Sequence, residues 1–133
     1  MKALRDAIHA KLVGDSTFLT LMGSPSAHPY RVFYLTPPEV PTFPEVVFRF
    51  EGAPADPESE LVLTDPSLVI TFYAATDAYH DLADRAIALL KNQTIGTDGT
   101  ALYMGMVADL YDDEFNVWGR TDRYQIARRR TAI

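Results

Sequence analysis

The amino-acid sequence predicts an α+β fold: one antiparallel sheet of about five strands, mixed at its edge, with two main helices packed on one face. The prediction starts from residues 67–92, SLVITFYAATDAYHDLADRAIALLKN. The first part of this segment alternates with period two and is rich in β-branched and aromatic residues, which is typical of a strand. Thr76 or Asp77 is then expected to cap a helix whose apolar residues recur at helical spacing.

The N-terminal segment is the second observation behind this fold class. Leu4, Ile8 and Leu12 share one stripe of an amphipathic helix, and Asp15 or Ser16 is expected to cap a short second helical turn. The sequence therefore predicts that helices precede and follow the first strands of the sheet.

Further strand candidates supply the rest of the sheet. They are the segments 31–35, 45–50, 101–111 and 123–132. All nine prolines lie between Pro25 and Pro66, which excludes long helices there and breaks the strands into short pieces. The connections between the strands are of hairpin length, which favours antiparallel pairing.

Composition indicates one soluble globular domain over residues 1–133. The chain is 47% hydrophobic and 23% charged, and this length is enough to bury a single core. It contains no cysteine, so disulfides, thiolate metal sites and cysteine nucleophiles are excluded. Neither a secretory signal nor a run of about 18–20 apolar residues is present, so we expect no export and no membrane partner.

Charge is unevenly distributed along the chain. The formal net charge of −6 argues against broad nucleic-acid binding. Acidic residues concentrate between Glu51 and Asp65 and again between Asp109 and Glu114, whereas five arginines lie from Arg120 to the end. Such segregation suits head-to-tail contact between copies or a polar channel, although scattered solvated loops would give the same pattern.

No catalytic or metal-binding motif stands out, so we expect neither an enzyme nor a cofactor. The three histidines are far apart, and phosphate-binding loops and nucleophile elbows are missing. Asp112, Asp113 and Glu114 offer oxygen ligands for a hard cation, but the ordered spacing of an EF-hand is missing. A hairpin tip is a normal position for such acids, and we predict no metal site.

Several strands are apolar on both faces, which two helices cannot cover. Val47 opposes Val46 and Phe48, and Tyr73 opposes Phe72. We therefore expect the second face to be buried against another copy or a partner, the alternative being a small curled barrel.

The residues from Arg128 to Arg130 extend this expectation to the end of the chain. In a strand Arg128 and Arg130 point one way and Arg129 the other. They are expected to pair with acidic loops of a neighbouring copy or to keep a terminal edge soluble.

Three segments together resemble one protein family. RVFYLTPPEVPTFPEVVFRF (31–50) resembles the first hairpin of the phage tail-completion proteins, also called tail terminators or tail-to-head joining proteins. Residues 67–92 are similar to that family's strand followed by an alanine-rich helix. DLYDDEFNVWGRTDRYQIARR (109–129) resembles its closing hairpin, although the run from Arg128 to Arg130 is heavier than the family pattern.

The resemblance implies a structural protein of the virion, made in the host cytoplasm and located at the head–tail junction. Such a protein forms a ring, typically of six copies, which caps the completed tail tube, ends its polymerisation and joins the neck of the head. Its partners would be the tail tube protein and a neck or head-completion protein, and DNA would pass through without specific binding. The alternatives are a head-closure or other neck component, a monomeric adaptor, or a small-ligand-binding α+β domain.

On this reading, two sets of residues are the candidate site. The candidate subunit interface comprises Val47, Arg49, Tyr73, Arg128, Arg129 and Arg130. The candidate docking or channel residues are Asp56, Glu58, Glu60, Asp112, Asp113 and Glu114. The acids would either line the channel, where a negative wall lets DNA slide, or reach the tail tube or neck from an end of the ring.

Replacing Asp56, Glu58 and Glu60 together with serine is expected to weaken head joining while leaving the fold intact, because only loop charges are removed. The yield of joined particles measures the effect, and circular dichroism checks the fold. An unchanged yield would contradict a docking role for these acids.

Overall fold

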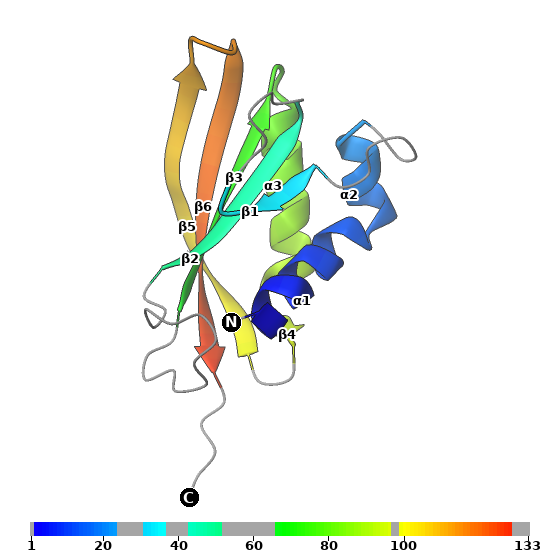
Figure 1. Ribbon diagram of the computed structural model, residues 1–133, viewed down its shortest axis with the longest axis vertical. Coiled ribbons are helices and arrows are strands. Elements are labelled where there is room, and N and C mark those ends of the chain that lie inside the picture. The colour runs from blue at the N-terminus through cyan, green and yellow to red at the C-terminus, as the bar shows by residue number, and fades with distance from the viewer. Residues whose placement is uncertain (1, 24–30, 37–42, 52–65, 97–98, 129–133) are drawn as a thin grey trace, which may run out of the picture.

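The computed structural model describes residues 2–23, 31–36, 43–51, 66–96 and 99–128. In chain order these form α1 (Lys2–Val13), α2 (Ser16–Leu21), β1 (Val32–Tyr34), β2 (Glu45–Glu51), β3 (Ser67–Ala74), α3 (Ala78–Leu90), β4 (Thr94–Ile95), β5 (Gly99–Asp112) and β6 (Val117–Arg128). The strands form one sheet in the order β1-β2-β3-β6-β5-β4. The helices cover one face of this sheet, and β5 and β6 form a long hairpin within the sheet (Figure 1).

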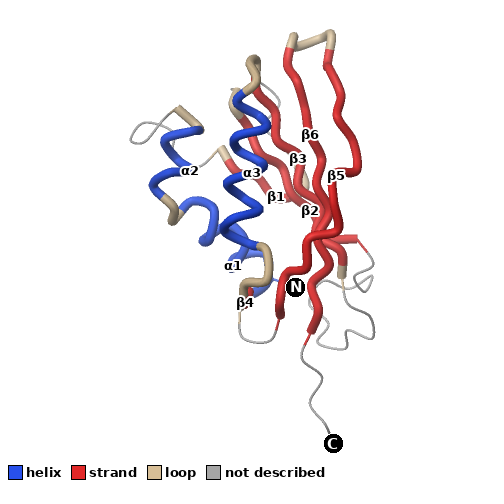
Figure 2. The backbone as a smooth tube through the Cα atoms, turned by 180° about the vertical axis from the view of Figure 1, so that it is seen from behind, coloured by secondary structure: helices blue, strands red, loops and turns tan. Residues whose placement is uncertain are grey.

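The α+β class predicted from the sequence is confirmed. The described part contains six strands in place of about five, and the short helix α2 joins the two main helices α1 and α3. All three lie on the same side of the sheet (Figure 2). No helix in the described ranges is long and apolar enough to cross a membrane.

The hydrophobic core lies between the helices and the central strand β3. Leu68, Ile70 and Phe72 are fully buried on the helix side of β3, as their alternation predicted. Apolar residues of α1 and α3 meet them there, and each comes from the helical stripe identified in the sequence: Leu4, Ile8, Leu12, Leu82, Ala83, Ala86 and Leu90.

The predicted first hairpin is wrong. Strands β1 and β2 run parallel, with Val32 opposite Val46 and Tyr34 opposite Phe48, whereas the other strand pairs are antiparallel. Alternation of apolar residues assigns each residue to a face of the sheet but carries no information about strand direction. The sheet is therefore mixed, with its one described parallel pair at the β1 edge.

The predicted start of the last strand is also wrong. Strand β6 begins at Val117, well before the expected start at Arg123, and pairs with β5 and with β3 along this stretch. Gly119, Arg120 and Asp122 suggest a turn in the sequence, yet the two charged residues are buried in the structure. Their burial is possible because they form an ion pair, described below.

Asp15 joins α2 to α3 and is the predicted cap. Its Oδ2 accepts a hydrogen bond from the Phe18 N–H (2.8 Å), and Arg85 donates to both carboxylate oxygens at 2.8 Å. The hydrogen bond from Arg85 is the main reason that the pKa of Asp15 lies below its ordinary value.

We expect D15A to lower the free energy of unfolding by about 1–2 kcal/mol at pH 7, because α2 loses its cap and its tie to α3. Since the pKa of Asp15 is lowered by folding, this contribution is complete above the unfolded pKa and is lost as the pH falls through the folded one. Urea denaturation at neutral and acidic pH should therefore show the gap between D15A and wild type narrowing in acid. D15N keeps a side-chain oxygen that can cap α2 but removes the negative charge, so it separates these two contributions. A stability difference between D15A and wild type that does not change with pH would contradict the ion-pair contribution.

Candidate assembly interface

Strand β5 forms an outer edge of the sheet. It pairs with β6 along its length, but β4 pairs with it only at Gly99 and Thr100. Beyond Thr100, its other side has no strand partner among the described residues. Soluble proteins usually protect such edges with charged residues or proline, yet the stretch from Thr100 to Ala108 contains neither.

The exposed apolar side chains concentrate on this hairpin. Nine large hydrophobic residues are exposed in the described part, and eight of them belong to β5, β6 or the turn between them: Leu102, Met104, Met106, Val107, Leu110, Tyr111, Phe115 and Trp118. We call the five aliphatic members, Leu102, Met104, Met106, Val107 and Leu110, the β5 edge. The register places Leu102 and Leu110 on the sheet face opposite the helices and Met106 on the helix side, so exposed apolar residues lie on both faces of this edge. Exposed apolar surface of this kind marks a site that another protein covers.

Two bulges shape the β5 edge. The register with β6 shifts between Tyr103 and Gly105 and between Met106 and Ala108, so Met104 and Val107 have no opposite residue. Their side chains are 59% and 55% exposed. A bulge interrupts the ladder and redirects a side chain, so the β5 edge is built for contact through side chains and not for addition of another strand.

Aromatic rings fix the far end of the hairpin to the rest of the domain. On the helix side, the Trp118 ring stacks on Tyr79 of α3 at 6.3 Å between centroids and contacts Tyr111 at 4.7 Å. On the other side, Tyr73 of β3 covers Gly119, where an added Cβ would lie 3.0 Å from the Tyr73 ring. Aromatic rings therefore pack on both faces of the hairpin, so its surface is already ordered in the single copy.

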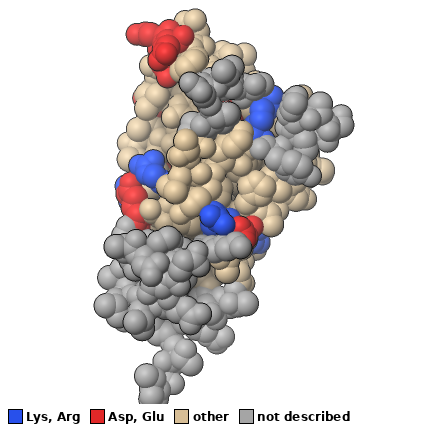
Figure 3. Space-filling model, viewed as in Figure 1, with Lys and Arg blue, Asp and Glu red and all other residues tan. Residues whose placement is uncertain are grey.

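The hairpin tip carries the predicted acidic cluster. Asp112 Oδ1 accepts hydrogen bonds from the backbone N–H groups of Glu114 (2.9 Å) and Phe115 (3.4 Å), which closes the turn. Asp113, the residue after Asp112, is exposed. Acidic side chains gather at this end of the molecule (Figure 3). The described residues include no group of three His, Cys, Asp or Glu side chains that could hold a metal ion.

A buried polar cluster holds β6 beneath α3. The Nε of Arg120 donates to Asp122 (3.0 Å), and its other nitrogens lie 3.1 Å from His80 Nδ1, 3.4 Å from Asp84 and 3.4 Å from the Tyr103 hydroxyl. Asp122 is fully buried, and burial raises its pKa while Arg120 opposes that shift. The cluster positions the middle of the β5–β6 hairpin against the core.

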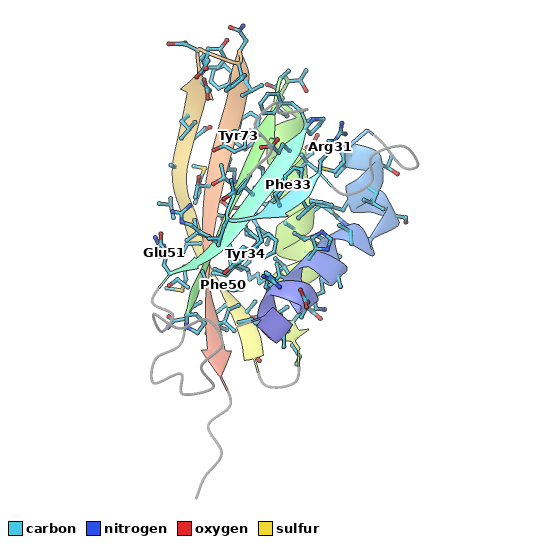
Figure 4. The ribbon with its side chains drawn as sticks, in the orientation of Figure 1. Arg31, Phe33, Tyr34, Phe50, Glu51 and Tyr73 are labelled. Carbon is cyan, nitrogen blue, oxygen red and sulfur yellow. The ribbon has the colours of Figure 1, made fainter. Side chains whose placement is uncertain are left out.

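The predicted interface residues Val47, Arg49 and Tyr73 share the sheet face opposite the helices, as alternation predicted. Val47 and Tyr73 are half-buried, and Arg49 is exposed (Figure 4 labels Tyr73 and Glu51). Glu51 accepts one hydrogen bond from Arg49 (2.9 Å) and forms an ion pair with Arg123 (3.0 Å). Charged side chains thus partly cover this face around Arg49, whereas Leu102 and Leu110 expose apolar surface on the β5 part of the same face.

Most of the remaining predicted residues lie outside the described part of the chain. The backbone of Arg128 pairs with Gly99, at the opposite end of the hairpin from Asp112. The side chain of Arg128 and the residues Arg129, Arg130, Asp56, Glu58 and Glu60 lie outside the described residues. Their roles stay predictions.

The β5 edge was not among the predicted site residues. The signal was present: the segment 101–111 is apolar at odd and even positions alike and holds no charge before Asp109. What the sequence lacked was the strand order, which places this segment at an edge of the sheet.

Comparison with known proteins gives a similar fold. No family model matches the chain, and no curated protein matches it. A solved chain from the virion of a native gene transfer agent (GTA) particle superposes with a TM-score of 0.62 at 14% sequence identity, covering 94% of this chain and 95% of that chain. The two chains share their fold over nearly their whole lengths.

Substituting one member of the buried pair tests the role of the polar cluster. R120M leaves Asp122 buried without its cation, so we expect a loss of about 3–5 kcal/mol in the free energy of unfolding at pH 7. A buried carboxyl with a raised pKa favours folding most at low pH and loses that contribution as the pH rises through the folded pKa. The loss should therefore shrink in mild acid, as measured by urea denaturation.

The double variant R120M/D122N is the matched control, because it removes the titrating group. Its own free energy of unfolding should depend less on pH than that of R120M, because the variant lacks the titrating carboxyl. An R120M loss of equal size at both pH values would contradict this assignment.

Proposed function

We propose that this protein is a structural component of a phage or phage-like virion, and that it works as a ring of identical copies. The observation that carries the proposal is the β5 edge: a strand that is paired with β6 on one side only beyond Thr100, with exposed aliphatic side chains, held in place by Trp118 on α3 and by Tyr73 of β3. The fold shared with a chain of a gene transfer agent virion supports the same class of function.

More specifically, we propose that the ring caps the tail tube, ends its polymerisation and joins the tail to the neck of the head. The resemblance of three segments to tail-completion proteins supports this finer role. The acidic hairpin tip lies at one end of the domain, where it would face an axial partner such as the tube or neck, and acids there would not retain the phosphates of passing DNA.

The proposed role is mechanical and not catalytic. A stable ring contact needs roughly 1,200 Å² or more of buried surface, so it must extend beyond the aliphatic side chains of the β5 edge. A head-closure component would use the same kind of ring on the portal side of the neck. Purified tail tubes and portals separate these two roles, since a terminator binds tube ends.

Mass measurement by light scattering tests the proposal. We expect the wild-type chain to form a discrete species near six copies at high concentration or at tail tube ends, seen as a ring by negative-stain microscopy. M104D/M106D should stay monomeric with an unchanged melting temperature, because both side chains are exposed in the monomer and only the contact must desolvate the new charges.

A88D is the matched control, since Ala88 is exposed on α3 away from the β5 edge. It should assemble as the wild type does. Wild-type protein that stays monomeric and fails to bind tube ends would contradict the proposal.

A further inference from the structure

We infer that neighbouring copies meet edge to edge, with the β5 edge of one copy packed against the β1 edge of the next, around Leu35. This inference rests on the proposed ring and names its contact. The β1 edge is defined here as Tyr34 and Leu35 with the adjoining Arg5 and Arg31.

The strand order is the first argument. β5 and β1 lie at opposite sides of the sheet, with only the two-residue β4 beyond β5. A contact between two β5 edges would pair the same surface twice and stop at a dimer. A contact between different edges repeats from copy to copy, and it closes into a ring when the rotation allows.

The exposed apolar residues are the second argument. Eight of the nine in the described part lie on the β5–β6 hairpin, and the ninth is Leu35, which is 57% exposed directly after β1. Leu35 has φ +68°, and the Thr36 N–H donates to the Tyr34 carbonyl at 2.8 Å, so Leu35 is the centre of a γ-turn. A strained turn that holds a large apolar side chain in solvent indicates a contact site.

The two edges also lie at the same level of the sheet. Tyr34 is opposite Phe48, Phe48 is opposite Ile70, Ile70 is opposite Asp122, and Asp122 is opposite Met106. Tyr34 is therefore level with Met106 across the whole sheet, and Leu35 lies one residue further along. Copies can join through these residues with only a small shift along the strands, which suits a contact that repeats by rotation.

Charge is complementary across the proposed contact. Asp109 and the tip acids flank the β5 edge, and no ion pair among the described residues involves them. Arginines flank the β1 edge. Arg31, which donates to the Met22 carbonyl, precedes the strand. Arg5, which pairs with the exposed Asp6 at 3.4 Å, has its guanidinium carbon 5.2 Å from the centre of the Tyr34 ring. Opposite charges on the two edges would favour the head-to-tail pairing over two like edges.

The β1 edge has a firm aromatic base for such a contact. The Tyr34 ring packs on Phe48 at 5.4 Å and on Phe50 at 6.0 Å between centroids, and Figure 4 labels Tyr34 and Phe50 on neighbouring strands. Because Met104 and Val107 lie in bulges of β5 and are exposed, side chains and not backbone hydrogen bonds would make the contact.

Cross-linking tests the contact directly, because the chain has no cysteine of its own. L35C and M106C are prepared separately, mixed under assembly conditions and treated with a short flexible bismaleimide, and the linked peptides are identified by mass spectrometry. We expect a 35–106 link in the mixture and no dimer from either variant alone. A88C mixed with L35C is the matched control and should give no link.

A second variant gives an independent measurement. L35N removes the apolar side chain, and asparagine tolerates positive φ, so the fold should be kept. We expect assembly to need about a tenfold or higher protein concentration, given the apolar surface that Leu35 would bury.

The outcomes separate the inference from the proposed function. Complete rings without a 35–106 link, or with L35N assembling as the wild type does, would overturn the edge-to-edge contact and leave the ring standing. Links of 106 to 106 alone would also overturn it. Absence of any assembly, in solution or on tail tubes, would overturn both.

Discussion

Beyond its first two residues, strand β5 hydrogen-bonds to β6 on one side and to no described strand on the other, and its outer side chains are aliphatic. The rest of the domain holds this edge in place. Trp118 stacks on α3, and the buried Arg120–Asp122 pair ties β6 to the core. Because the hairpin is already ordered, a neighbour that covers it has little conformational entropy to remove.

The elements with a strong period could be predicted from the sequence. The strand and helix of residues 67–92, the apolar stripe of α1 and the cap at Asp15 all lie where the pattern places them. The assignment of Val47 and Tyr73 to the face opposite the helices was also correct, because a strand's side chains alternate strictly. Alternation and helical spacing are local properties, and the local structure follows them.

What could not be predicted depends on contacts between distant segments. The start of β6 was hidden because Arg120 and Asp122 are charged, and their burial needs the partners that only the folded sheet supplies. The sequence predicted a sheet mixed at its edge, as observed, but it placed β1 and β2 in a hairpin. Their parallel pairing and the position of β5 at an edge are matters of strand order, which apolar alternation does not encode. The strand order therefore favours the β5 edge as the candidate interface, in place of the predicted residues Val47, Arg49 and Tyr73.

Methionine oxidation followed by mass spectrometry measures most directly whether the β5 edge is buried in the assembled protein. Met104 and Met106 are exposed in the single copy, whereas Met22 is fully buried in the core and serves as the internal reference. The account predicts that peroxide oxidises Met104 and Met106 rapidly in the monomer and, in the assembled ring, at a rate close to that of Met22. Rings in which both residues are oxidised as fast as in the monomer would contradict it.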